Sequence, residues 1–244
     1  APTAGALLAR FLGGGRIQWG RPNLWIIAGL IPTAAALGVY LIGSAVGWVS
    51  SDSGLVGLAM VSAPLSIAFA SLSAVGEEIG WRGFLWPALR SRAGFWSTSL
   101  VILVIWWAYH VPLILLGWYG SMAGLPAFTV AIAGFVLFIG VLTDRARSLW
   151  PSVIAHGSWN ALVATSFAVN TGGIRIPAFE GDPALLGEFG WLAAVTSAVL
   201  GGLTAWWHVS HPLANPGAHR HAPAAPESAS ARAAVPEAAP AEPE

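Results

Sequence analysis

The sequence contains no cysteine and no lysine, and only 9% of its 244 residues are charged. The lack of cysteine excludes disulfide bonds, thiolate metal sites and a cysteine nucleophile. Acidic and basic side chains are equal in number, so the net charge is zero and nothing in it indicates a nucleic-acid partner. Soluble domains are about one quarter charged, whereas this chain is 56% hydrophobic. The composition therefore predicts an integral, multi-pass membrane protein surrounded by the lipid bilayer.

Long apolar stretches support this prediction. Each is near the ~20 residues that a helix needs to cross a bilayer, and tryptophans lie near most of their ends, as in the aromatic belts of membrane proteins. We therefore expect an all-α fold, a bundle of about six transmembrane helices around a buried polar site. The expected spans are residues 24–48, 54–76, 96–118, 125–143, 149–168 and 190–208.

Three regions of the chain differ in composition. Residues 1–22 mix apolar side chains with arginines and predict an amphipathic segment at the membrane interface. Residues 23–209 contain the apolar stretches and predict the transmembrane domain. Residues 210–244 are rich in alanine, proline and glutamate without periodicity, which predicts a disordered C-terminal tail.

The arginines predict the orientation of the chain in the membrane. With six alternating spans, ten arginines fall on one side and only Arg175 on the other. The positive-inside rule assigns the richer side to the cytoplasm, so both termini are predicted to be cytoplasmic. The ten are Arg10, Arg16, Arg21, Arg82, Arg90, Arg92, Arg145, Arg147, Arg220 and Arg232.

The most unusual stretch is residues 76–90, where two adjacent acids and an arginine follow an apolar run. Ionisable groups at membrane depth are costly and are functional candidates by default. On a helix, Glu78 and Arg82 lie on one face and can form an ion pair. Glu77 points about 100° away from Glu78 and has no local partner. We therefore expect a tethered acid, Glu78, and a free one, Glu77.

Other polar residues lie at a similar depth on other predicted helices. Glu77, His110 and Asn160 are each thirteen or fourteen residues, ~20 Å along a helix, from the arginine-rich side. His156 is one turn shallower than Asn160 and on the same helix face. We expect these four side chains to meet in a cavity that faces the cytosol. His208, near the end of the last span, is expected to be solvated and idle.

A free carboxylate, two imidazoles and an amide suit the hydrolysis of a carbonyl compound. A carboxylate and an imidazole can activate water as general bases, and imidazole and amide N–H groups can hold an oxyanion. An alternative is a divalent metal site, zinc above all, with Glu77, His110 and His156 as ligands. No H-E-x-x-H motif marks a common zinc protease. We expect no cofactor and no metal.

The arrangement E-E-x-x-x-R from Glu77, an aromatic residue four positions before His110, and H-x-x-x-N from His156 resembles the three motifs of the CPBP intramembrane proteases. This group includes the CAAX prenyl endopeptidases and the Abi-type, bacteriocin-processing proteins. The resemblance covers about residues 60–165, within the transmembrane domain. Trp106 stands where phenylalanine is usual, and we expect it to be tolerated as an aromatic residue.

The resemblance implies an intramembrane endopeptidase, glutamate-dependent or metal-dependent, that acts on a peptide or membrane-protein substrate. It implies that Glu77 and His110 activate water and that His156 and Asn160 form the oxyanion hole. Two further classes remain open from the residues alone. One is a non-catalytic immunity or binding protein, and the other is a helix bundle that conducts protons or solutes.

Overall fold

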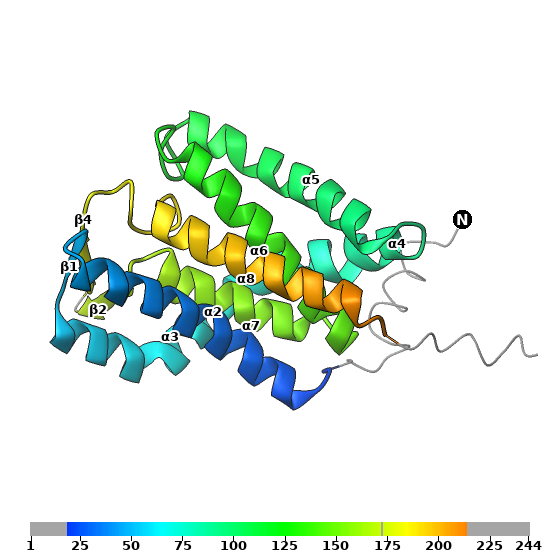
Figure 1. Ribbon diagram of the computed structural model, residues 1–244, viewed down its shortest axis with the longest axis horizontal. Helices are drawn as coiled ribbons and strands as arrows, with labels where there is room; N and C mark the ends of the chain where they lie inside the picture. Colours follow the sequence, from blue (N-terminus) through cyan, green and yellow to red (C-terminus); the bar gives the residue numbers. More distant parts are fainter. Residues whose placement is uncertain (1–18, 172, 214–244) are drawn as a thin grey trace, which may run out of the picture. The chain divides into compact units, whose positions relative to one another are not determined.

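The computed structural model describes residues 19–171 and 173–213 (Figure 1). The amphipathic segment expected at residues 1–22 and the tail expected at 210–244 lie mostly outside the described residues. The helices and strands belong to one compact unit that ends at His211. They are α2 (Pro22–Ala45), β1 (Val49–Ser51), α3 (Ser53–Glu78), the π-helix η1 (Ile79–Leu85), α4 (Trp86–Arg90), α5 (Phe95–Leu115), α6 (Leu125–Ala146), α7 (Trp150–Ser158), the π-helix η2 (Trp159–Val163), β2 (Val169–Thr171), β3 (Ile174–Ile176), β4 (Phe179–Gly181) and α8 (Trp191–Ser210).

The helical membrane fold is confirmed. Five helices in the described part of the chain are long and apolar enough to cross a bilayer. One of them is the continuous run of α3, η1 and α4, whose 38 residues from Ser53 to Arg90 exceed a single bilayer crossing. The sixth expected span, 149–168, is helical only from Trp150 to Val163, and this helix is not one of the five candidates. It is too short because the chain turns into a loop after η2.

Successive long helices run in opposite directions, so their connections lie at two distinct ends of the bundle. We call the end with the four short strands and the α5–α6 connection the loop end. There β1 pairs antiparallel with β4, and β2 pairs antiparallel with β3. The other end, where α3–α4 and α6 finish and α5 begins, is the arginine end. Figure 1 shows the strands at the left and α4 at the right. The strands are small additions to the predicted all-α bundle.

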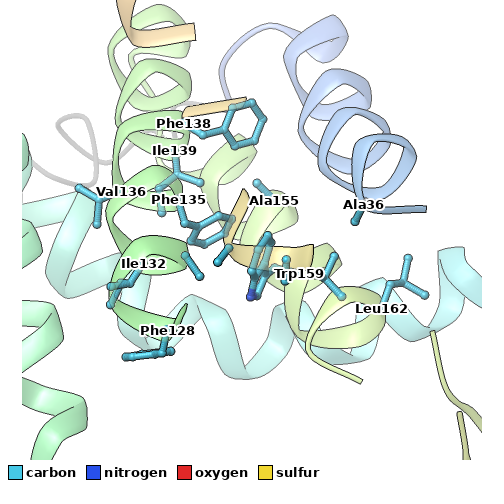
Figure 2. Close-up of a cluster of buried hydrophobic side chains, with 14 of the residues drawn as sticks. Ala36, Phe128, Ile132, Phe135, Val136, Phe138, Ile139, Ala155, Trp159 and Leu162 are labelled. Carbon is cyan, nitrogen blue, oxygen red and sulfur yellow. The ribbon is translucent and has the colours of Figure 1, made fainter. Parts of the chain in front are cut away.

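The most deeply buried span is α6, which packs along α8. Their backbones touch at two glycines, because a Cβ on Gly134 would lie 2.2 Å from the Ser197 carbonyl oxygen and one on Gly201 only 2.0 Å from the Gly134 oxygen. Such small residues let membrane helices approach closely. On the other side of α6, Phe135 packs against Trp159 of η2, with ring centroids 5.1 Å apart (Figure 2). The core thus positions η2 directly against α6.

A polar cluster holds the arginine end together. The Asp144 carboxylate accepts hydrogen bonds from Trp86 Nε1 at 2.8 Å and Arg90 Nε at 3.0 Å, and lies 3.2 Å from His208 Nε2. Arg145 Nε donates to His208 Nδ1 at 3.0 Å, which leaves the His208 proton on Nε2 for Asp144. His208 is buried here, so the expectation that it is solvated and idle is wrong. This cluster joins α4, α6 and α8.

Candidate active site

A cavity of about 910 Å³ lies in the half of the bundle nearer the loop end. This volume is in the usual range for ligand sites, about 300–1,000 Å³. The lining comes from the end of α3, from α5, α6, α7 and η2, and from the connections before α6 and α8. All four residues expected to be catalytic line it: Glu77, His110, His156 and Asn160.

Glu77 lies in the last turn of α3, and its carboxylate is held from a second helix. Trp106 Nε1 on α5 donates a hydrogen bond to Glu77 Oε2 at 3.0 Å, across 29 residues of sequence. Trp106 is almost completely buried and contacts the rings of both His110 and His156. The local sequence predicted a free Glu77, but the structure gives its carboxylate a hydrogen-bond partner on another helix. The donor is the indole N–H that a phenylalanine at position 106 would lack.

His110, near the end of α5, has one ring nitrogen fixed by its own helix. Its Nδ1 lies 2.8 Å from the carbonyl oxygen of Trp106, which can only accept a hydrogen bond. Nδ1 is therefore the protonated nitrogen, and the neutral ring keeps Nε2 as an acceptor. Tyr119 and Phe128 pack against the ring from the loop end. The imidazole thus has a defined tautomer and a defined orientation in the cavity wall.

His156 on α7 also has its Nδ1 atom fixed, but by the side chain of Glu78 on another helix. Its Nδ1 lies 2.9 Å from Glu78 Oε1, although the two residues are 78 positions apart. The same oxygen lies 3.4 Å from Arg82 NH1, which confirms the predicted i, i+4 pair. Both members of that pair are fully buried and neither lines the cavity. Glu78 therefore links η1 to α7 and stands behind His156.

Two local features bring α7 against α3. A Cβ on Gly157 would lie 2.1 Å from Ser71 Oγ and 2.9 Å from its backbone nitrogen, so only glycine permits this approach. Both functional helices also pass into π-helix beside the site: η1 contains Arg82 and η2 contains Asn160. Short π segments are rare in proteins, and those that do occur are often found at functional sites. The Asn160 side chain has no hydrogen-bond partner among the described residues, which leaves its amide available to a ligand.

The sequence did not single out Glu188, which the structure places in the cavity wall. Trp159 Nε1 donates to Glu188 Oε1 at 3.2 Å, and the Tyr119 hydroxyl donates to Oε2. Burial raises the pKa of Glu188, and burial together with the Glu188 charge raises the pKa of Tyr119. Glu188 lies in a connection without a motif, so only the tertiary fold reveals its position.

The side chains proposed as zinc ligands share the cavity but do not form a ligand set. Among residues 19–171 and 173–213, no three His, Asp or Glu side chains are grouped so as to hold a metal ion. The arrangement of Glu77, His110 and His156 therefore does not fit a preformed zinc site.

The cavity lies at the other end of the bundle from most of the arginines. Its lining includes residues of the α5–α6 connection and residues 182–189 before α8, but none of the six described arginines that the sequence assigned to the cytoplasmic side. His110 is only five residues, ~7.5 Å, from the end of α5 at Leu115. A cavity that faces the arginine-rich side was expected, and the lining does not match this expectation.

Comparisons with known proteins agree with the motifs. Residues 59–162 match the family model "Type II CAAX prenyl endopeptidase Rce1-like", and this range contains all six of the site residues expected from the sequence. A curated relative, CAAX prenyl protease 2 of Methanococcus maripaludis, is 40% identical over 43 residues, which cover 18% of this chain and 16% of the relative. The match thus spans less than one fifth of that relative's length. No solved structure matches the chain.

Proposed function

We propose that the chain is an intramembrane endopeptidase, because residues 59–162 match the Rce1-like type II CAAX prenyl endopeptidase family, a family of proteases. It hydrolyses a peptide bond with water that Glu77 and His110 activate. The main support is that one cavity inside a membrane bundle is lined by a carboxylate, two oriented imidazoles and an unpaired amide.

Glu77 and His110 act as bases in this mechanism. Trp106 occupies Glu77 Oε2, so Oε1 remains to accept a proton from water. His110 offers the lone pair of Nε2, because its Nδ1 proton is directed to a backbone carbonyl. The water oxygen attacks the peptide carbonyl carbon, and the proton it loses is passed on to the leaving amine.

His156 and Asn160 stabilise the oxyanion that forms on the carbonyl oxygen. Asn160 donates from its amide, and His156 donates from Nε2 while Nδ1 stays on Glu78. An imidazolium donates from both nitrogens, so this task needs the charged form of His156. Each donor to an oxyanion is worth about 2.7–4 kcal/mol in other enzymes. Glu78 and Arg82 support the site from behind the cavity wall.

A conducting bundle is the weaker proposal, since a conduit needs polar groups along the whole membrane depth. The cavity lining extends from the loop end only as far as Glu77 and His156. In an immunity or binding protein, oriented general bases would have no task. The observed grouping at one depth therefore favours a reaction site.

The substrate is a peptide or a membrane-protein segment that enters from the loop end. If the positive-inside rule holds, both termini and the arginine end are cytoplasmic and the cavity faces the opposite side. Because the chain has no cysteine, single cysteines report the topology cleanly. Labelling of intact cells should reach Ser121→Cys, at the cavity rim, but not Arg92→Cys; the reverse pattern would overturn the orientation. Both residues are exposed.

The proposed activity is tested by Glu77→Gln, which keeps the side-chain shape and removes the base. Peptide cleavage by the protein in lipid nanodiscs should fall by about 10²–10⁴-fold, the usual contribution of a general base. The matched control is Glu180→Gln, an exposed residue of β4 that does not line the cavity. Cleavage by Glu77→Gln at the wild-type rate would refute the assignment.

A further inference from the structure

Glu188 is a carboxylate of the cavity wall that the proposed reaction does not use. It lies beyond the residues matched by the family model and is partly buried. Both oxygens are held by neutral donors, Tyr119 and Trp159, so the carboxylate is oriented. No arginine in the described part of the chain forms an ion pair with it, whereas Glu78 and Asp144 each have one.

A carboxylate in such surroundings is costly to keep charged. Burial without a cationic partner disfavours the ionised form, which is consistent with the raised pKa of Glu188. Nearby imidazoles offset this cost only in part, since the charges of His110 and His156 lower the pKa of Glu188 less than burial raises it. A cation that enters the cavity would remove the cost.

The rest of the lining also favours a positive ligand. Glu77 adds a second carboxylate, Asp182 a third at the rim, and Arg175 is the only arginine among the described lining residues. Much of the remaining wall is aromatic. Aromatic faces bind ammonium and guanidinium groups, and they also pack well against the methylene stems of long basic side chains.

We propose that Glu188 is a cation-binding subsite of the cavity, which receives a lysine or arginine side chain, or a free amino terminus, of the peptide substrate. This inference rests on the proposed function, because it places the cation within reach of the reaction site. The Glu188 carboxylate pairs with the cation while Tyr119 and Trp159 keep it in place. A substrate that presents a carboxylate at this position is repelled, since like charges in a poorly solvated site oppose each other.

The inference is tested by binding, so that its outcome does not depend on catalysis. The Glu77→Gln protein in nanodiscs is titrated with fluorescent eight-residue peptides of neutral residues. One position at a time carries lysine, norleucine or glutamate, and each peptide is made with a free and with an acetylated amino terminus. The two termini separate binding of a side chain from binding of the amino group.

At one position, the lysine peptide should bind about tenfold more tightly than the norleucine peptide, which corresponds to about 1.4 kcal/mol. Adding Glu188→Gln should remove this preference and leave the norleucine peptide within about twofold. Glu188→Asp should keep part of the preference, and Glu180→Gln all of it. If the preference comes from the free amino terminus, acetylation should abolish it in the same Glu188-dependent way.

Four results would overturn the inference: no binding of any peptide, no preference for a cation, a preference that survives Glu188→Gln, or an equal loss for all peptides. The last result would assign Glu188 a purely structural role. The proposed protease activity fails by a different result, namely cleavage that does not depend on Glu77. The two conclusions can therefore fail independently.

Discussion

The pair of Glu78 and Arg82 allows the sharpest test of how the site is supported. Glu78→Gln keeps the shape of the side chain, and the amide oxygen can still accept a hydrogen bond from His156. The change removes the negative charge that faces both Arg82 and His156. The guanidinium is completely buried, and its Nε and NH2 atoms have no other partner among the described residues. The variant therefore leaves an unpaired buried cation.

Breaking a buried pair by removal of one charge costs about 3–5 kcal/mol. For a chain of this size, each kcal/mol changes Tm by about 2–4 °C, so we expect a decrease of about 6–20 °C. Removal of both charges should be far less harmful, because neutral or apolar replacements of buried pairs are often tolerated. The double variant Glu78→Gln/Arg82→Met should thus be more stable than Glu78→Gln alone. Methionine is flexible enough to fill the space beside Trp106, which the guanidinium carbon now occupies 4.6 Å from the ring centre.

The assay is thermal unfolding in detergent, followed by tryptophan fluorescence, with Glu180→Gln as the surface control. If the free energy of unfolding of Glu78→Gln lies within about 0.5 kcal/mol of the wild-type value, the buried charge of Arg82 does not need Glu78 as its partner. A double variant no more stable than the single one would show that the loss arises from the His156 contact instead. Either result would refute the reasoning about the buried charge.

Three further outcomes follow from the structure. Gly157→Ala should lower both Tm and cleavage, since overpacking costs about 1–3 kcal/mol. Gly76→Ala should lower neither, because a Cβ at this position beside Glu77 would meet open space. Equal effects of the two variants would contradict the close contact of Gly157 with α3. Because burial raises the pKa of Glu188, the folded state holds that proton more tightly. The associated stability is present below its ordinary value of 4.5 and is lost as pH rises through the raised value. The Tm of the wild type minus the Tm of Glu188→Gln should therefore decrease as the pH rises above 4.5, and an increase would contradict the predicted sign. Finally, cleavage should survive exhaustive chelation, and elemental analysis should find no stoichiometric zinc; zinc lost and restored together with activity would defeat the metal-free mechanism.

Local spacing was sufficient to predict much of this molecule. Hydrophobicity and span length depend on neighbouring residues alone, so the membrane class and five of the six spans could be read from the chain. The Glu78–Arg82 pair follows from the helical repeat. Helix depth, counted in residues, brought Glu77, His110 and Asn160 to one level, and the structure places all three in one cavity.

Contacts between distant segments were decided only by tertiary packing. The bond from His156 to Glu78 depends on the approach of two helices at Gly157, and the bond from Trp106 to Glu77 depends on how α5 lies beside α3. Neither has a local signature. Glu188 reaches the cavity because the connection before α8 folds back over its wall. The end at which the cavity lies was also fixed by these connections, since residue counts measure depth along each helix but do not show how the connections cover the bundle.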